Sequence, residues 1–405
     1  MGVKFLQFSD VHMGATTSSS KLNLPMDKTK QRQEELQGIF KKACAIAKER
    51  NIDIVLIPGD LWDDESISTD MALFTFEQLQ GIAPIPVFIT PGNHDYYSFT
   101  SFYNKTLYEE TSRKKSPDNV HIFTEKTFQS FQFTTQTGVS INIAGIVYSE
   151  VVNGRLFAQP IPKSPDALNI LVFHGSLDNI ELSADKKKYF PFSKAELLNQ
   201  GFDYAAIGHY HGYQQIKDEQ GRIRGAYAGC PAGLGLDETG EKYLLYGEIE
   251  KGGRINLEKI SLDKRQIRDI EIKWDNLMSS DRVKEMIEDR LSQDGVNEDD
   301  IVYLRLNGVY PPAEPLYLPD DFLKERFFHV QIDYSGLRPD YDISAILNDL
   351  NADKKVEGMF VKKIMEKIEK AKKQKDEREE RLWRAALYYG LDAVNEKEVK
   401  PGYED

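Results

Sequence analysis

Two pairs of residues in this chain have the types and spacing of metal ligands. Asp10 and His12 stand two apart after one apolar run, and His209 and His211 repeat this spacing after another. Side chains two apart on an extended backbone point to the same side, so both members of each pair could reach one ion. Carboxylate and imidazole donors at this spacing therefore indicate a metal site.

Three further donors follow other apolar runs: Asp60, Asn93 and His174. The combined set has nitrogen and oxygen donors, which suit Mn, Fe, Zn, Co or Ni rather than Ca or a thiolate-bound metal. The predicted metal ligands are thus Asp10, His12, Asp60, Asn93, His174, His209 and His211.

Asp60 holds the central place in this hypothesis. The apolar run 54–57 predicts a buried strand, and Pro58 with Gly59 ends it in a tight turn. Asp60 would then lie at the carboxyl end of a strand, which is where ligands bind in open α/β sheets. Taken alone, Asp60 reads more simply as a turn aspartate that hydrogen-bonds its own backbone. Together with the other donors, it could bridge two ions.

If Asp60 bridges, each ion has four protein ligands, and positions stay open for water and substrate. Two ions about 3.5–4 Å apart can activate a bridging water, hold a phosphate and stabilise both oxygens of an in-line displacement. The sequence therefore predicts hydrolysis of a phosphoester.

His94 follows the predicted ligand Asn93 directly and is free to act on the substrate. We expect it to orient the phosphate or to help protonate the leaving oxygen. Asp95 could fix the tautomer of His94. The remaining histidines, His121 and His329, are expected to have no role in the site.

The bulk composition indicates a folded protein of two or three domains. The chain has 405 residues, of which 40% are hydrophobic, and only two cysteines, too few for a disulfide framework or a thiolate zinc site. No signal-peptide pattern or membrane-spanning run is found, so we expect a cytoplasmic protein without a membrane contact. The net charge of -13 argues against a generally basic, groove-coating nucleic-acid binder. A negatively charged substrate must be attracted locally.

Strands and helices are expected to alternate through the first part of the chain, which is typical of a layered α/β domain. Helical periodicity appears around 36–47, where Cys44 reads as a core residue, and around 73–79. From residue 131 onward strands dominate, at 139–147, 169–173, 204–207, 223–228, 243–249 and 255–260. A second sheet is implied, and the first domain should end near Leu262.

A small mixed unit and a helical tail follow. The pattern predicts strands at 270–274, 302–306 and 328–332 and a helix at 282–291. In the tail, apolar stripes lie at 361–371 and 382–387, the first among lysines. Either stripe could pack on its own domain or dock a partner. No GxxxxGK[ST] loop is present, so ATP binding of that kind is not expected.

The sequence leaves the roles of two segments undecided. The aromatic residues Phe99, Phe102 and Tyr103 and nearby Leu107 suit either core packing or a contact surface for bases or a second subunit. The polar, Ser-rich loop 15–24 is too hydrophilic for the core, and could alter access of substrate.

The ordered blocks DVH, GDLWDD, GNHD, FHG and GHYHG resemble the calcineurin-type metallophosphoesterase family. The resemblance implies a four-layer αββα sandwich. It also implies one metal held by Asp10, His12, Asp60 and His211, the other held by Asp60, Asn93, His174 and His209, and His94 as catalytic residue.

Within that family the chain more closely resembles SbcD, the nuclease subunit of the SbcCD DNA repair complex. The segment AGCPAGLGLDETGEKYLLYGEIE carries this resemblance, with Cys230 where serine is common. It implies a nuclease domain at 1–262, a small α+β capping domain at 263–340 that positions DNA, and C-terminal helices at 341–405 that bind a partner. The implied cofactor is Mn²⁺, and the implied activities are double-strand exonuclease and single-strand endonuclease. The implied partners are DNA, an SbcC-like coiled-coil ATPase and a second copy in a homodimer.

Two other functions remain open. One is a phosphoesterase acting on a nucleotide, cyclic nucleotide or phosphoprotein, which the ligands alone do not separate from a nuclease. The other is a non-catalytic scaffold that kept the fold and lost the metals.

Overall fold

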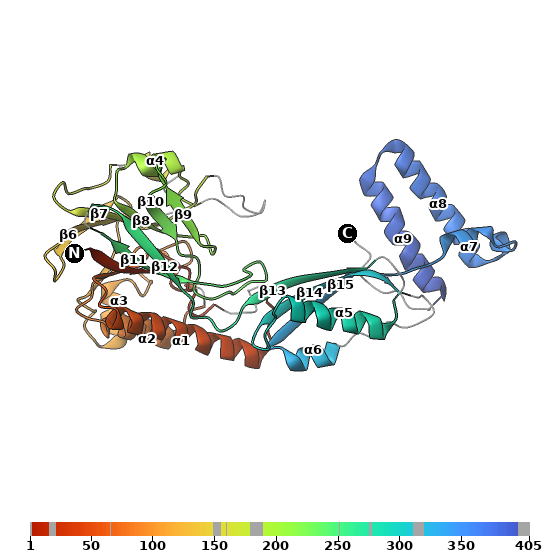
Figure 1. Ribbon diagram of the computed structural model, residues 1–405, viewed down its shortest axis with the longest axis horizontal. Helices are drawn as coiled ribbons and strands as arrows, with labels where there is room; N and C mark the ends of the chain where they lie inside the picture. The colour runs from red at the N-terminus through yellow and green to blue at the C-terminus, as the bar shows by residue number, and fades with distance from the viewer. Residues whose placement is uncertain are drawn as a thin grey trace. The chain divides into compact units, whose positions relative to one another are not determined.

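The chain forms two compact units, Met1–Gln266 and Ile267–Asp405, in a computed structural model (Figure 1). The structure describes residues 2–15, 22–64, 66–148, 155–158, 160–178, 189–250, 252–274, 278–310 and 320–395. Most of the Ser-rich loop predicted at 15–24 lies outside the described residues. The first unit is a mixed α/β fold with two sheets, as the sequence predicts, and each sheet has six strands.

The first sheet has the strand order β12-β11-β1-β2-β3-β4. Strands β1 to β4 run parallel, while β11 pairs antiparallel with both β1 and β12. The strands are β1 (Val3–Gln7), β2 (Ile54–Ile57), β3 (Val87–Ile89), β4 (Val120–Ile122), β11 (Leu244–Ile249) and β12 (Ile255–Ile260).

The second sheet has the order β5-β6-β7-β8-β10-β9 and is parallel from β6 to β10, with an antiparallel strand at each edge. The strands are β5 (Gln129–Thr134), β6 (Ser140–Gly145), β7 (Leu168–His174), β8 (Tyr204–Gly208), β9 (Gln214–Lys217) and β10 (Ile223–Tyr227).

Helices cover the outer faces of the two sheets. The helices of this unit are α1 (Met26–Glu49), α2 (Thr69–Gln80), α3 (Lys105–Ser112) and α4 (Lys194–Asn199), with a short 3-10 turn η1 (Leu156–Ala158). Ser68 caps α2 by accepting a hydrogen bond from the backbone of Met71, and Ser193 with Glu196 forms a capping box on α4.

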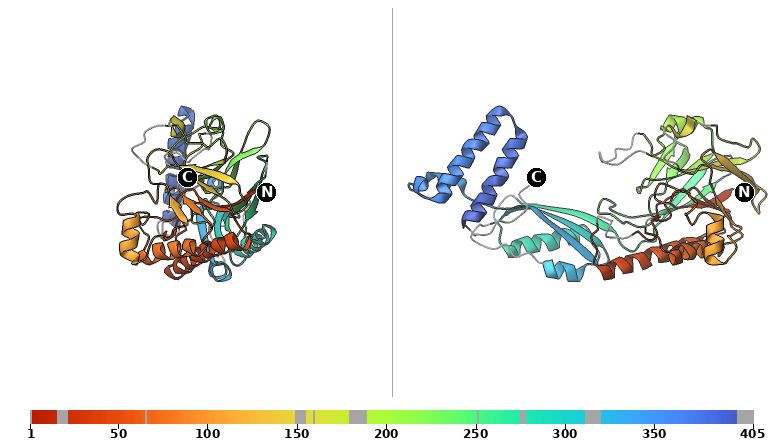
Figure 2. Two further views of the ribbon diagram at one scale, coloured as in Figure 1. Left: turned by 90° about the vertical axis from the view of Figure 1, so that its left-hand side faces the viewer. Right: turned by 180° about the vertical axis from the view of Figure 1, so that it is seen from behind.

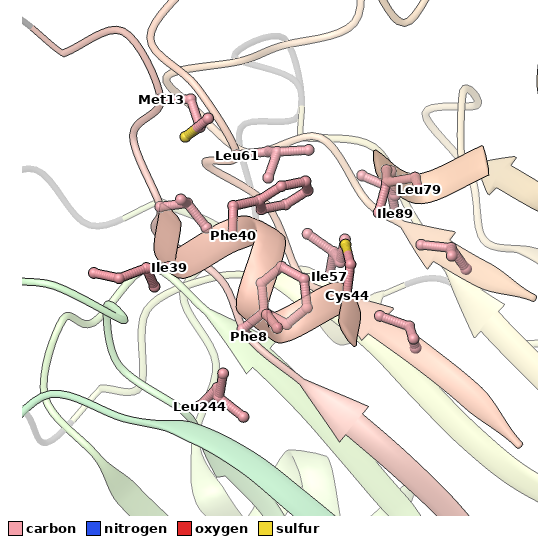
Figure 3. Packing of buried hydrophobic residues seen from close by; sticks show 14 of the residues in the cluster. Phe8, Met13, Ile39, Phe40, Cys44, Ile57, Leu61, Leu79, Ile89 and Leu244 are labelled. Carbon is pink, nitrogen blue, oxygen red and sulfur yellow. The ribbon is translucent and has the colours of Figure 1, made fainter. Parts of the chain in front are cut away.

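The order of layers follows from three apolar cores. One core lies between α1, α2 and the first sheet, and Figure 3 shows Phe40 and Cys44 of α1 facing Phe8 and Ile57. A second core lies between the sheets, and a third joins the second sheet to Leu197 of α4. The layers are therefore helix, sheet, sheet, helix.

A buried polar contact joins the two sheets. Gln7 of β1 donates through its side-chain nitrogen to the carbonyl of Ala226 at 2.8 Å, and accepts from the Tyr204 hydroxyl at 2.6 Å. A buried polar group without a hydrogen bond would be costly. The contact therefore favours this one placement of the first sheet on the second.

The first unit extends to Gln266, past the boundary predicted at Leu262. An ion-pair cluster that the hydrophobic pattern does not reveal lies at this boundary. Arg32 of α1, which is 1% exposed, donates to both oxygens of Asp263 at 2.8 and 2.5 Å, and Arg265 pairs with Glu35 at 2.6 Å. These contacts hold residues 263–266 against α1.

The second unit contains the residues that the sequence divides between a cap at 263–340 and a tail at 341–405. Its three-stranded parallel sheet has the order β13-β14-β15, with one helix after each of the first two strands. The elements are β13 (Ile267–Trp274), α5 (Ser280–Gln293), β14 (Ile301–Tyr310), α6 (Asp320–Arg326) and β15 (His329–Pro339).

The tail is helical, as predicted, and pairs with itself. Its elements are α7 (Ile343–Asn348), η2 (Ala352–Lys354), α8 (Val356–Gln374) and α9 (Glu377–Asn395). Val361, Ile364 and Ile368 of α8 pack with Leu387 and Leu391 of α9, and the rear view in Figure 2 shows the two helices side by side. The first apolar stripe is thus covered within the chain, whereas Leu382 in the second is 64% exposed.

Most predicted elements are present, and those at 54–57 and 255–260 match their observed strands residue for residue. Strands β4, β5 and β9 were not predicted; they are edge strands with many polar or half-exposed residues. Such strands lack the continuous apolar run that marks a central strand. Among the described residues, no helix is both long and apolar enough to cross a bilayer.

Candidate metal centre

All the predicted ligands lie at the carboxyl ends of the parallel strands or in the loops that follow them. Asp10 and Asp60 follow β1 and β2, and backbone hydrogen bonds join the two loops, from Asp10 to the Gly59 carbonyl and from His12 to the Asp60 carbonyl, both 3.1 Å. Asn93 follows β3, His174 ends β7, and His209 and His211 follow β8. Both sheets therefore contribute donors to one edge of the sandwich.

Several ligands have an uncommon backbone conformation. The φ angles are +53° for Asp10, +50° for His12, +51° for Asp60 and +108° for His209. Left-handed φ values are costly for non-glycine residues and gather where function requires a fixed geometry. The surrounding hydrogen bonds and packing must hold these four residues in place.

Glycines allow the loops to approach closely. A Cβ at Gly92 would lie 2.3 Å from Oδ1 of Asp60, and one at Gly59 would lie 2.5 Å from Nδ1 of His174. A Cβ at Gly208 would lie 1.8 Å from the Pro58 carbonyl oxygen. Any side chain at these positions would push the donors apart.

Asp10, His12, Asp60 and His211 converge as one group. The Nε2 atoms of His12 and His211 are 3.3 Å apart, His12 Nε2 lies 4.0 Å from Oδ2 of Asp60, and His211 Nε2 lies 3.9 Å from Oδ1 of Asp10. This is the donor set that the family resemblance assigns to the first ion.

A second group forms around His174. Its Nε2 lies 3.3 Å from Oδ2 of Asp60 and 2.9 Å from Oδ1 of Asn93, while the His209 ring centroid is 5.2 Å from that of His174. Oδ2 of Asp60 thus faces a histidine of each group, which is the placement that a bridging carboxylate requires.

In three of the ligand histidines the Nδ1 atom already has a hydrogen-bond partner, so the Nε2 atom is left for a metal. Nδ1 of His12 lies 2.7 Å from Asp63, Nδ1 of His211 lies 2.5 Å from Glu238, and Nδ1 of His174 lies 3.0 Å from the Pro58 carbonyl oxygen. Carboxylate or carbonyl partners of this kind fix the tautomer and orientation of metal-binding histidines. The donor chemistry and the fixed rings fit two divalent ions.

The sequence analysis did not single out Asp63 or Glu238. Both stand inside quoted motifs, Asp63 three residues after Asp60 in GDLWDD and Glu238 in the segment that follows the last histidines. Their acidic type was the available signal, but their partners could be identified only in the folded chain.

His94 lies beside the first group. Its Nδ1 is 3.2 Å from Oδ1 of Asp63, its ring centroid is 4.9 Å from that of His12, and its side chain is 52% exposed. The hydrogen bond to Asp63 raises the pKa of the His94 imidazole, although burial opposes the shift. His94 is therefore accessible and disposed to carry a proton.

The role expected for Asp95 is wrong. Its buried carboxylate accepts from the backbone of Asp60 at 3.1 Å, Leu61 at 2.7 Å and Gly92 at 2.5 Å, and from the Tyr103 hydroxyl at 2.6 Å. The carboxylate that pairs with the His94 ring is that of Asp63. Asp95 instead ties the Asp60 turn to the loop that carries Asn93.

The electrostatics of the protein without metal favour an ionised Asp60. Burial would raise the pKa of Asp60, but the charge of His174 holds it well below the ordinary range. Burial lowers the pKa of His209 to about 3, with help from the charge of His174, so His209 is neutral near pH 7. An ionised carboxylate and a neutral imidazole are the forms that bind metal ions, so Asp60 and His209 are in their binding forms. Burial would lower the pKa of His174, but the charge of Asp60 raises it to about 9, so His174 must release a proton when it binds a metal ion.

The remaining candidates lie outside this cluster or at its border. In the aromatic segment, Tyr103 is buried and belongs to the core, whereas Phe99 is 90% exposed. Cys230 is buried, with Sγ 3.6 Å from Oε2 of Glu238. His121 stacks on Phe88 with ring centroids 5.0 Å apart, and His329 begins β15 in the second unit.

The family model for calcineurin-like phosphoesterases matches residues 3–213, more than half of the chain. The chain belongs to this family. The match includes every predicted ligand, and family membership supports hydrolysis of phosphoester bonds at a dimetal centre.

Curated relatives include an uncharacterized metallophosphoesterase, YhaO of Bacillus subtilis, which is 29% identical over 205 residues, covering 49% of this chain and 47% of that protein. The DNA double-strand break repair protein Mre11 of Methanopyrus kandleri is 23% identical over 304 residues, covering 67% of this chain and 59% of that protein. Mre11 of Sulfurisphaera tokodaii is 25% identical over 290 residues, covering 68% of this chain and 66% of that protein. This chain spans from about half to just under two thirds of these relatives' lengths.

Among solved structures, TT1561 of Thermus thermophilus covers 65% of this chain and 100% of its own, with a TM-score of 0.38 and 14% identity. The match to a dimetal phosphatase from Danio rerio covers 64% of this chain and 96% of that protein's chain, with a TM-score of 0.38 and 12% identity.

Proposed function

We propose that this protein is a two-metal, Mn²⁺-dependent DNA nuclease, with double-strand exonuclease and single-strand endonuclease activity, in an SbcCD-like repair complex. The observation that carries the hydrolytic part is the convergence of all seven predicted donors, with His94 beside them, on one edge of the sandwich. The choice of DNA is supported by the similarity to Mre11 proteins, which covers about two thirds of the chain.

The site residues divide the chemical work. When bound, two divalent ions would lower the pKa of a water and offset negative charge on the phosphoryl oxygens. Asp10, His12, Asp60 and His211 would hold one ion, and Asp60, Asn93, His174 and His209 the other.

His94 acts on the substrate itself. With Nδ1 directed to Asp63, its Nε2 is available to a phosphate oxygen or to the leaving oxygen. The hydrogen bond to Asp63 raises the pKa of His94, which favours the protonated ring, and His94 would donate its proton to the leaving oxygen as the phosphodiester bond breaks. Asp63 is a positioning residue that orients both His94 and His12.

A substrate comparison tests the proposal. The purified full chain, loaded with Mn²⁺, is expected to cut duplex ends and single-stranded DNA, and chelation is expected to stop cleavage. Affinity for DNA should fall steeply with salt, because a protein that binds phosphates releases counterions. Hydrolysis of nucleotides, cyclic nucleotides or phosphopeptides at a rate insensitive to salt, with DNA left intact, would contradict it.

The second unit supplies the proposed partner contacts. We place the DNA-positioning role on the β13–β15 sheet and the ATPase contact on the α8–α9 pair. Because the α8 stripe is covered by α9, the partner would use outward residues such as Leu382, with Arg378 and Arg381 beside it. An SbcC-like ATPase should co-purify with the full chain but not with Leu382→Glu. Sedimentation of the full chain tests the proposed homodimer.

A further inference from the structure

A basic groove lies at the opposite end of the sandwich from the metal centre. It has a volume of about 740 Å³ and lies between the β9–β10 turn of the second sheet and the β11–β12 turn of the first. Asp203, which lines it, directly precedes β8, whose other end leads to His209. Ile249, the last residue of β11, pairs with Val3 at the start of β1. The groove is therefore at the amino ends of the strands that carry the ligands.

Cationic side chains from both turns line this groove: Lys217, Arg222, Arg224 and Arg254. Arg222 and Arg224 share one carboxylate, Asp218, through their Nε atoms at 2.8 and 3.0 Å. Within the described part of the chain, Lys217 and Arg254 have no ion-pair partner. Asp203 is the one acid among the described residues that line the groove, so positive charge is in excess there.

The carboxylates near the groove are engaged elsewhere. Asp203 accepts a hydrogen bond from the backbone of Asn169 at 2.8 Å, and Glu250 accepts from the side chain of Asn256 at 2.6 Å. Asp218 also accepts from the backbone of Gln220 at 3.0 Å, which fixes the turn. These bonds hold the acids in the walls of the groove, and among the described residues they leave Lys217 and Arg254 without an acidic partner for their charge.

The local backbone favours a binding role. The pairing of β9 with β10 shifts register between Ile223 and Gly225, which makes Arg224 the extra residue of an irregularity in the strand. Such bulges redirect a side chain. A Cβ added at Gly221 or Gly252 would meet nothing within 4 Å, so both turns border open space that a bulky ligand could enter.

We infer that this groove binds phosphate groups of a nucleic-acid backbone, in a segment separate from the one held at the metal centre. The inference rests on the proposed function, because it takes DNA as the substrate. Guanidinium and ammonium groups match phosphate oxygens in charge and geometry. None of the described residues that line the groove is an aromatic side chain that could stack on bases, so the groove would bind the backbone, independently of sequence. In a chain of net charge -13, such a groove gives a polyanion a local place to bind.

The salt dependence of DNA binding tests the inference. Affinity of the full chain for a long labelled duplex is measured by fluorescence anisotropy in EDTA, which prevents cleavage, over a range of salt concentrations. The double variant Lys217→Gln/Arg254→Gln should bind more weakly. When the logarithm of the affinity is plotted against the logarithm of the salt concentration, the slope for this variant should be less steep. The expected decrease is about 0.9 for each phosphate that the variant no longer neutralises, or roughly 1.8 for two phosphates.

The matched control is Lys41→Gln/Lys42→Gln, which removes the same charge from the exposed surface of α1. It should keep the wild-type slope. All three proteins should hydrolyse bis(p-nitrophenyl) phosphate at the same rate with Mn²⁺, because none of these residues touches the metal centre.

The outcomes separate the two claims. If wild-type protein binds DNA and the groove variant matches the control, the groove inference fails and the proposed function stands. If wild-type protein neither binds nor cuts DNA, the proposed function fails, and the inference fails with it. If the groove variant loses affinity only for inorganic pyrophosphate, with its DNA salt slope unchanged, the site serves a small anion and the backbone assignment is overturned.

Discussion

The two ends of the first unit lie at opposite edges of the same two sheets but differ in burial and charge. At the carboxyl end, Asp10 and Asp60 are at most 2% exposed, and four ligands have left-handed backbone angles. At the amino end, Lys217 and Arg254 are exposed, and the neighbouring turns border open space. A buried, constrained cluster fixes geometry for chemistry, whereas an exposed cluster supplies charge for binding. Changes to the ligands and to His94 at the first end should therefore impair catalysis, and changes at the second end should alter only the affinity for DNA.

The largest expected effect is at Asp60. Asp60→Asn removes the charge that faces both histidine groups, so both ions should bind weakly, and cleavage should fall below detection. Metal content measured on the purified protein, together with hydrolysis of bis(p-nitrophenyl) phosphate, checks this. The control is Asp203→Asn at the amino end, which should keep its metal and its rate. An equal loss of metal and of hydrolysis rate in both variants would contradict the assignment of the chemistry to the carboxyl end.

His94→Gln should have the next largest effect. The variant loses the proton donor but none of the seven predicted ligands, so kcat should fall by about 10²–10⁴-fold while metal content is unchanged. Rates and metal stoichiometry on the same preparation separate the two effects. Unchanged cleavage would refute the role assigned to His94, and a parallel loss of metal would make His94 part of the binding set.

Asp63→Asn should be milder, because Asp63 acts through His12 and His94. A loss of about 10–100-fold in activity or metal affinity is expected for an outer partner of this kind. The hydrogen bond to Asp63 raises the pKa of His94, so the variant should lose activity at a lower pH on the alkaline side of its pH–rate profile. Asp64→Asn is the matched control, since Asp64 accepts from Trp62 at 2.7 Å instead. A pH profile that does not move would exclude the positioning role.

The smallest expected effect is at Tyr103, whose hydroxyl donates to Asp95 behind the ligands. Tyr103→Phe should lower the free energy of unfolding by about 1–3 kcal/mol, because a buried acceptor loses a donor. Tyr108→Phe is the control, since its buried hydroxyl has no hydrogen-bond partner among the described residues, and it should be neutral or slightly stabilising. Denaturant titration compares the two. Equal effects would show that the bond to Asp95 contributes nothing to stability.

The sequence predicts the carboxyl end much better than the amino end. Donors such as Asp10 and His174 each follow an apolar run, so strand ends bring them together by the topology of a parallel sheet. Asp95 was misassigned because adjacency in sequence does not give direction, and the turn at Asn93 sends its carboxylate behind Asp60. Arg224 had no signal, because a bulge appears only when two strands pair. The first unit ends at Gln266, close to the predicted Leu262, but the Arg32–Asp263 contact near this boundary could not be predicted, because it joins residues far apart in the chain.

The most direct test of the central claim is anomalous scattering from crystals of the full chain grown with Mn²⁺. The account predicts two peaks at the carboxyl end, one on each side of Asp60, with Nε2 of His12 and His211 on one and Nε2 of His174 with Oδ1 of Asn93 on the other. A single peak that Asp60 does not touch, or no peak at this end at saturating Mn²⁺, would contradict it.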